Sequence, residues 1–230
     1  MAELPPSPYF PPIEMADPDG LLGIGGQLTP DWLLDAYRRG IFPWPITGGA
    51  EMLAWWSLDP RAILPLDGFH LPRRLRATLR SGPFSVTCNR DFHGVITGCA
   101  TAGGRVGHTW LTPEMIAAYQ RLHELGHAHS VEAWHAGRLA GGIYGVAIGG
   151  SFSGESMFHR VRDASKVALA HLVAHLRARG FTLMDIQQLT PHTEQFGAIE
   201  IPRDEFLARL SEALSLPVTF GAELESPGRF

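Results

Sequence analysis

The sequence predicts a mixed α/β fold, of the α+β type, whose sheet is mainly antiparallel. Three strand-like runs at 130–134, 138–148 and 151–158 follow one another and are separated only by glycine-containing turns. A long helix is expected directly after them at 163–179, and a further strand at 181–188. Because strands joined by tight turns run antiparallel, we expect an antiparallel meander beside which the last strand returns.

Before residue 62, the chain is expected to be irregular apart from one early helix. Residues 1–20 contain six prolines and should be extended. A helix is predicted at 30–39, since Thr29 can cap its start, Pro30 suits a first turn and Gly40 favours a stop.

Capping residues mark further elements along the rest of the chain. We expect a strand at 84–88, and then a short helix that Asn89 caps and that ends at Thr97. Asp163 is the expected cap of the long helix, and a last helix is predicted at 202–214.

Residues 123–127 match H-E-x-x-H, a pattern found in zinc proteases. That chemistry needs both histidines on one face of a helix. The helix that Thr112 opens should end at Gly126, so His127 would fall outside it. We therefore expect ordinary histidines at a helix end, and no metal site.

The composition is that of a globular protein. Of the 230 residues, 45% are apolar and 18% charged, which excludes a disordered chain.

Irregular, tryptophan-rich sequence gives way to periodic sequence near residue 62, so we expect a small N-terminal domain at 1–62 and a larger domain at 63–230. The longest run without a charge, 139–154, is interrupted by six glycines, which excludes a membrane-spanning helix. With no secretory signal and two cysteines, a cytoplasmic protein is expected.

The net charge of −4 argues against a protein that wraps nucleic acid, but the basic residues are grouped. A guanidinium group fits phosphate oxygens better than an ammonium group does. One group lies between 61 and 80, against a single acidic residue: Arg61, Arg73, Arg74, Arg76 and Arg80. Another lies between 156 and 182: Arg160, Arg162, Lys166, Arg177 and Arg179. Two basic patches suit a phosphate-bearing partner, and solvated helix faces are the alternative.

Three polar residues are expected at the ends of neighbouring strands. Glu155 lies near the end of the third meander strand, and Asp185 and Gln187 lie on the returning strand. Strand alternation puts Asp185 and Gln187 on one face. They should converge with Glu155 on one cleft, and structural hydrogen bonding is the alternative.

Blocks along nearly the whole chain resemble the bacterial leucyl/phenylalanyl-tRNA–protein transferases. Several of these blocks are too long to match by chance, and their order is that of the family. The resemblance rests on residues 10–12, 20–22, 39–44, 55–57, 59–61, 123–130, 142–146, 152–158, 164–166, 185–187, 192–193 and 197–198. Since the family's pattern includes the His-rich block, the resemblance weakens the zinc interpretation further.

The resemblance implies a small N-terminal domain followed by a GNAT-like acyltransferase domain. It also implies the reaction: Leu or Phe, and less well Met, moves from aminoacyl-tRNA to the N-terminal Arg or Lys of a protein. That protein is thereby marked for degradation by the N-end rule. Because the aminoacyl ester is already activated, no cofactor is expected. A CoA-dependent acetyltransferase would need a glycine-rich loop before the long helix, and residues 159–166 contain no glycine.

By the same resemblance, Asp185 and Gln187 match the catalytic pair, and Glu155 matches the acidic residue of the site. We expect the side-chain oxygen of Gln187 to orient the attacking amine while its NH₂ group bonds to Asp185. The cationic side chain of the acceptor should lie near Glu155 or Asp185.

The remaining predicted contacts concern the donor. Met157, Ile143 and Phe152 are expected to form its apolar pocket, and Ile143 stands where the family usually has Met. Trp56 and Trp110 are expected to hold the terminal adenosine. The acceptor-stem phosphates are assigned to Arg73, Arg74, Arg76 and Arg80, because these basic residues are grouped in the sequence.

Overall fold

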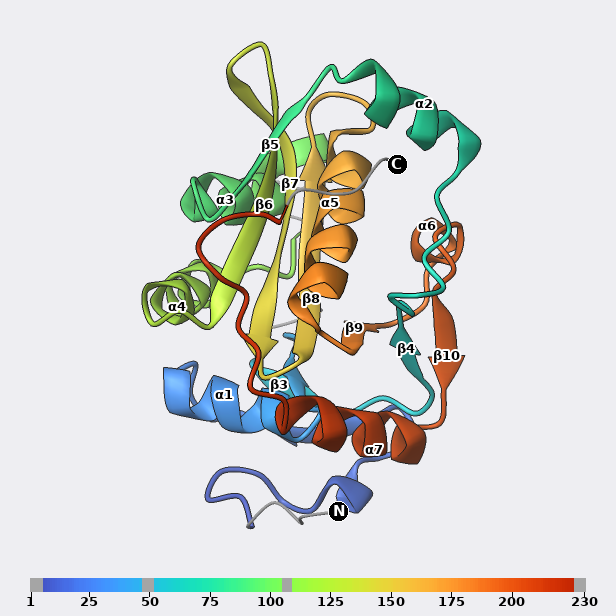
Figure 1. Cartoon of the computed structure of the whole chain (residues 1–230). Coiled ribbons are helices and arrows are strands. Elements are labelled where there is room, and N and C mark those ends of the chain that lie inside the picture. Colours follow the sequence, from blue (N-terminus) through green and yellow to red (C-terminus); the bar gives the residue numbers. More distant parts are fainter. Residues whose placement is uncertain (1–5, 47–51, 105–108, 226–230) are drawn as a thin grey trace.

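The computed structural model describes residues 6–46, 52–104 and 109–225, which form two sheets with helices around them (Figure 1). The strands are β1 (Leu21–Ile24), β2 (Phe42–Pro43), β3 (Ala54–Trp56), β4 (Arg61–Ile63), β5 (Ser85–Cys88), β6 (Ala128–His135), β7 (Arg138–Ile148), β8 (Ser151–His159), β9 (Leu183–Gln187) and β10 (Ile199–Ile201). The helices are α1 (Pro30–Arg38), α2 (Arg73–Ser81), α3 (Phe92–Thr101), α4 (Pro113–Glu124), α5 (Ala164–Arg179), α6 (Pro191–Glu194) and α7 (Arg203–Leu214), with short 3₁₀ turns η1 (Ile13–Met15) and η2 (Ala102–Gly104).

The large sheet has the strand order β10-β4-β9-β8-β7-β6-β5. Its neighbours are antiparallel except for β8 and β9, which run parallel. The helix α5 connects these two strands, and a crossover of this kind brings a strand back in the same direction. The predicted mixed and mainly antiparallel sheet is therefore confirmed.

Helices cover both faces of the large sheet (Figure 1). Strand residues alternate between the two faces. On β7, Tyr144 and Val146 pack in the cluster that contains residues of α3 and α4, whereas Ile143 and Ala147 pack in the cluster that contains residues of α5. This alternation explains why β7 is apolar along most of its length: it is buried on both faces.

The small sheet, β1-β3-β2, belongs to the N-terminal part and packs against the larger part. Leu33 and Trp55 share one buried cluster with Phe92 and Tyr119 of α3 and α4. The strand β4 lies across the predicted boundary at 62/63 and pairs within the large sheet. The division into domains at that point stays a prediction.

Most elements with strong capping or turn signals lie where the sequence predicted them. Thr29 and Thr112 accept hydrogen bonds from the first turns of α1 and α4, as expected. The expected cap at Asn89 is wrong, because Asp91 caps α3 by accepting from the Gly94 backbone N–H at 2.8 Å. Asp163 directly precedes α5, but its side chain makes no capping bond.

Candidate active site

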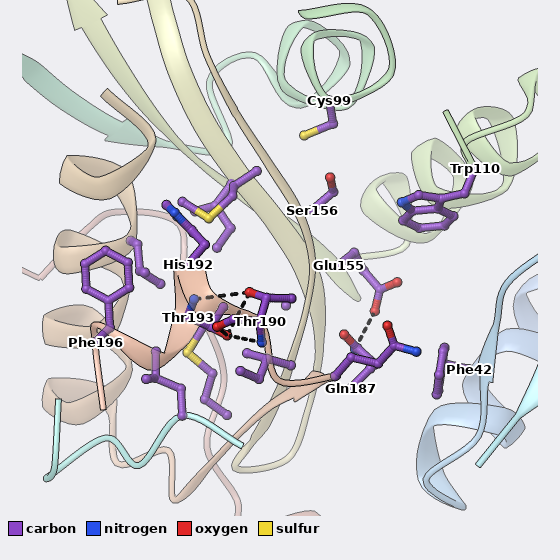
Figure 2. Close-up of a pocket in the computed structure, with 18 of the residues that line it drawn as sticks. Phe42, Cys99, Trp110, Glu155, Ser156, Gln187, Thr190, His192, Thr193 and Phe196 are labelled. Carbon is purple, nitrogen blue, oxygen red and sulfur yellow. Dashed lines mark hydrogen bonds between the residues drawn. The ribbon is translucent and has the colours of Figure 1, made fainter. Parts of the chain in front are cut away.

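A pocket of about 400 Å³ opens beside β8 and β9 (Figure 2). Glu155 and Gln187 face each other at one side of it, near Phe42 and Trp110, whereas Phe196 lies at the opposite side of the view. Much of the remaining lining is apolar. The other lining residues are Trp44, Leu64, Cys99, Thr109, Ile143, Gly154, Ser156, Met157, Leu169, Met184, Ile186, Gln188, Thr190, His192 and Thr193.

Glu155 reaches this pocket from a β-bulge in β8. On β7, Tyr144 and Gly145 are consecutive, but their partners on β8 are Ser156 and Gly154. Glu155 is therefore the extra residue of the bulge. A bulge redirects a side chain out of the regular alternation of the strand, and here it directs the carboxylate toward the pocket.

Two buried tyrosines hold the carboxylate of Glu155. The Tyr119 hydroxyl donates to Oε2 of Glu155 at 2.9 Å and lies 2.7 Å from the Tyr37 hydroxyl. Since Tyr119 gives its one proton to Glu155, Tyr37 is the donor in the second bond. Burial raises the pKa of Glu155 to about 7, although the two tyrosine hydrogen bonds oppose that rise. Glu155 can therefore gain or lose a proton near neutral pH.

Gln187 ends β9 in a left-handed backbone conformation, with φ at 58°. Its side-chain nitrogen lies 3.4 Å from Oε1 of Glu155. With the amide turned over, the nitrogen instead donates to the carbonyls of Gly154 and Ile186, both at 3.0 Å. We favour this orientation because its two bonds have better lengths. The amide oxygen then faces Glu155, so two acceptors stand side by side at the pocket wall.

Asp185 does not line the pocket, so its expected position is wrong. Its carboxylate is 2% exposed and binds the guanidinium group of Arg61 through two bonds, at 2.8 and 2.7 Å. The contact with Gln187 uses the Gln187 backbone N–H, which donates to Asp185 at 3.0 Å, and not the side-chain amide. The left-handed backbone at Gln187 ends the alternation that placed both side chains on one cleft.

Of the three residues predicted to form the apolar donor pocket, two line the pocket and one lies in the core. Met157 and Ile143 line the pocket. Phe152 is 1% exposed and packs against Phe220 of the C-terminal segment and against the Cα side of Gly145, away from the pocket lining. Its assignment to the pocket wall is therefore corrected to a core position.

The aromatic pair at the pocket consists of Trp44 and Trp110. Their rings stack with centroids 4.7 Å apart at an interplanar angle of 17°. Trp56 is outside the lining, and its indole N–H donates to the Trp44 carbonyl at 2.8 Å. The partner of Trp110 at the pocket is thus Trp44, and the expected pairing with Trp56 is wrong. The sequence held a signal for this, because Trp44 ends the block 39–44.

Tyr37, Tyr119 and Arg61 were not predicted as residues of the site, although Arg61 lies in the block 59–61. Tyr37 and Tyr119 occupy buried positions on α1 and α4 that resemble ordinary core positions. Arg61 was counted as part of a basic patch, yet it is 1% exposed and far from solvent. The four predicted tRNA-binding arginines, in contrast, are exposed on α2. Their role stays a prediction.

The helix that contains His123 ends before His127, as the sequence predicted. The helix α4 stops at Glu124, before His127, and Gly126 has a φ of 80°. The His123 ring stacks on Phe92 with centroids 4.3 Å apart, and its Nδ1 lies 2.8 Å from the Ala128 carbonyl oxygen. His123 is therefore held as a helix-end residue.

Comparison with known proteins identifies the family. The family model described as leucyl/phenylalanyl-tRNA protein transferase matches residues 63–211, and the model of that family's N-terminal domain matches residues 26–59. The chain belongs to this family. Relatives with the name leucyl/phenylalanyl-tRNA–protein transferase occur in Nitratidesulfovibrio vulgaris strain DP4, 55% identical over 92% of this chain and 90% of the relative, and in Anaeromyxobacter dehalogenans, 50% identical over 98% and 97%. A third, in Magnetococcus marinus, is 51% identical over 92% and 91%.

Similarity to solved structures is weak. L-PGS from Bacillus licheniformis aligns with a TM-score of 0.39 and 14% identity over 72% of this chain and 52% of that chain. A GCN5-related N-acetyltransferase-like protein from Streptococcus suis 89/1591 gives a TM-score of 0.35 and 12% identity over 74% and 63%. Neither value is high enough to bear on function. Within the described ranges, every helix is too short or too polar to cross a bilayer.

Proposed function

We propose that this chain transfers leucine, phenylalanine or, less well, methionine from aminoacyl-tRNA to the N-terminal Arg or Lys of acceptor proteins. Family membership supports the reaction class. The observation that carries the proposal is the facing pair of Glu155 and Gln187 at one side of a largely apolar pocket. The product would mark the acceptor for degradation by the N-end rule. Since charged tRNA is used in the cytoplasm, we place the reaction there.

The apolar part of the pocket suits the donor side chain. Met157, Ile143, Leu169 and Met184 surround it with aliphatic groups. Such a lining excludes charged side chains by their desolvation cost. It separates Leu from Phe or Met poorly, because a methylene group is worth only about 1–3 kcal/mol.

The polar side of the pocket suits the incoming amine. An N-terminal ammonium group can donate to the Gln187 oxygen and to the Glu155 carboxylate, two acceptors that otherwise face each other. Ionised Glu155 takes one proton, and the neutral nitrogen attacks the ester carbonyl. The C–N bond forms while the ester C–O bond breaks, and Glu155 returns the proton to the leaving ribose oxygen of the tRNA. The nitrogen then still carries one proton more than an amide, and Glu155, ionised again, accepts this second proton and releases it to water.

The tryptophan pair supports binding of the tRNA end. Trp44 is 39% exposed and stacks on Trp110 at the pocket, and the terminal adenine would stack on this pair. Stacking of this kind contributes about 1–3 kcal/mol per base. The arginines of α2, exposed on a separate element, would contact phosphates further along the acceptor stem.

A second cavity supports a cationic acceptor. It measures about 290 Å³ and shares Gln187 and Gln188 with the main pocket. Asp19, Asp59 and Glu200 also line it, whereas the charge of Asp185 is neutralised by Arg61. The basic side chain of the acceptor would therefore lie toward these three carboxylates, and the expected contact with Asp185 is dropped.

The test is transfer to two peptides that differ only in their first residue. The chain is incubated with leucyl-tRNA and a peptide that begins with Arg or with Gln, and products are weighed by mass spectrometry. We expect one leucyl residue to be added to the Arg peptide at a rate at least about 10-fold above the Gln peptide. Equal transfer to both would contradict the acceptor assignment, and absence of transfer to either would contradict the proposed reaction. Acetyl-CoA in place of leucyl-tRNA should give no product.

A further inference from the structure

Arg61 is a fully buried charge outside the pocket lining. It lies on β4 and is 1% exposed. Its guanidinium group forms a two-pronged bond with Asp185, from Nε to Oδ1 at 2.8 Å and from Nη2 to Oδ2 at 2.7 Å. Nη1 donates to the Gly40 carbonyl at 3.0 Å. Arg61 therefore connects β4, β9 and the segment after α1.

Aromatic rings enclose the guanidinium group on two sides. The Phe42 and Phe206 ring centroids lie 4.7 and 4.6 Å from its central carbon. Moving both charges of an ion pair into such a place costs desolvation energy that their attraction only partly offsets. Apolar residues of similar volume would stabilise the fold as well or better. Stability alone thus gives a weak reason for Arg61 and Asp185.

Asp185 connects Arg61 to the backbone of Gln187. Its Oδ1 accepts both from Arg61 Nε and from the backbone N–H of Gln187. Gln187 has a φ of 58°, a left-handed conformation that is unfavourable for a residue other than glycine. This same conformation directs the Gln187 side chain at Glu155. A carboxylate fixed by Arg61 stabilises the strained turn by accepting the N–H that the turn presents.

We infer that Arg61 is a positioning residue: through Asp185 it fixes the backbone of Gln187 and so places the Gln187 amide beside Glu155. The inference rests on the proposed transfer reaction, in which Gln187 touches the amine. It assigns Asp185 to support of the site and not to contact with substrate. It also links the N-terminal part to the site, because the Phe42 ring packs on Arg61 and lines the pocket.

The test uses Arg61→Lys, which keeps the charge but loses the two-pronged bond. We expect kcat to fall about 10- to 100-fold, since a small displacement of a catalytic group has effects of that size. The KM for leucyl-tRNA should change less than about 2-fold, because the donor pocket and the tryptophan pair are untouched. Asp185→Asn, a near-isosteric change, should give the same split. Arg179→Lys is the matched control: Arg179 also makes several hydrogen bonds, but to Thr219 and Glu225 in the C-terminal segment, and kcat should stay unchanged.

A double-mutant cycle separates positioning from general support of the fold. In the Gln187→Ala background, Arg61→Lys should lower kcat less than about 2-fold further, because the group it positions is absent. An additional 10-fold loss in that background would overturn the inference, as would a folded Arg61→Lys chain with unchanged kcat. Folding is checked by the thermal unfolding midpoint, with kcat measured well below it.

A readout without catalysis distinguishes failure of this inference from failure of the proposed function. The Gln187 side-chain NH₂ group, assigned by its loss in Gln187→Ala, should shift in ¹⁵N–¹H spectra of Arg61→Lys and stay in place in Arg179→Lys. If the unaltered chain makes no transfer product, the proposed reaction fails on its own, and this spectrum still decides whether Arg61 positions Gln187. An unshifted resonance contradicts the inference.

Discussion

At the residue scale, Glu155 combines two opposing influences on one carboxylate. Burial raises its pKa to about 7, although hydrogen bonding by the Tyr119–Tyr37 pair opposes that rise. The pKa of Tyr119 is itself well above the ordinary value because the hydroxyl is buried, so Tyr119 stays a donor at every pH of interest. The protonation of Glu155 thus depends on residues from α1 and α4 that lie outside the pocket lining.

This arrangement predicts how the reaction responds to pH. If ionised Glu155 accepts the proton of the amine, the transfer rate rises as pH increases through about 7. Tyr119→Phe removes a bond that lowers the pKa of Glu155, so the midpoint of the rise should move to higher pH. The measurement is the single-turnover rate over a pH series with one peptide, which keeps the titration of its α-amine the same in both chains. A midpoint that stays fixed in Tyr119→Phe contradicts this account of Glu155.

The sequence indicated some site residues but could not indicate contacts between residues that are far apart in the chain. Glu155 and Gln187 belong to short blocks that carry the family resemblance, so they were found. Arg61 and Asp185 lie 124 residues apart, and no local pattern predicts that they meet. The expected bond of Asp185 to the Gln187 amide failed because alternation was extended one residue past the point where β9 leaves regular geometry.

At the scale of the elements, helices and strands with local signals were predictable. The helix α4 has a Thr cap, a first-turn proline and a glycine stop, and β7 matches its expected bounds. The helix α2 was missed because Pro72 precedes it without a side-chain capping bond and only Leu75 is buried. The strands β4 and β10 have three residues each, too few for a period, and exist because β4 pairs with β9 and β10 pairs with β4.

The exposure of α2 leads to a prediction about tRNA. Replacing Arg73 and Arg74 by Ala should remove about two phosphate contacts, so the slope of log affinity against log salt should decrease by about 2. Affinity for uncharged tRNA is measured over a salt series. The control replaces two other exposed helix arginines, Arg121 and Arg209, which are paired with Glu124 and Glu205. An equal change of slope in the control, or no change for α2, contradicts the assignment.

At the scale of the whole molecule, the C-terminal segment closes one face of the large sheet. Phe220 is 2% exposed and stacks on His129 of β6 with centroids 4.3 Å apart. The Nδ1 of His129 lies 3.1 Å from the Asn89 amide nitrogen, and Nε2 lies 3.1 Å from the Gly126 carbonyl oxygen. A neutral ring with its proton on Nε2 satisfies both contacts. Burial accordingly lowers the pKa of His129 to about 4.

Acid should therefore destabilise the fold through His129. In the unfolded chain the ring gains a proton below its ordinary pKa of 6.5, whereas in the folded chain it stays neutral down to about 4. The unfolded state binds more protons in this window, so the free energy of unfolding falls as pH decreases through it, by up to about 3 kcal/mol. Urea unfolding at a series of pH values should show a shallower fall for His129→Gln. Parallel curves for the two chains would contradict the prediction.

The central claim is that the amine attacks the aminoacyl ester beside the Gln187 amide. Its most direct test is the single-turnover rate of transfer from leucyl-tRNA to a peptide that begins with Arg, with tRNA affinity measured in parallel, for the unaltered chain and for Gln187→Ala. The account predicts a rate at least about 100-fold lower in Gln187→Ala. It also predicts that tRNA affinity stays within about 2-fold, because Trp44, Trp110 and α2 are unchanged. A Gln187→Ala chain that transfers leucine at the unaltered rate would contradict the claim.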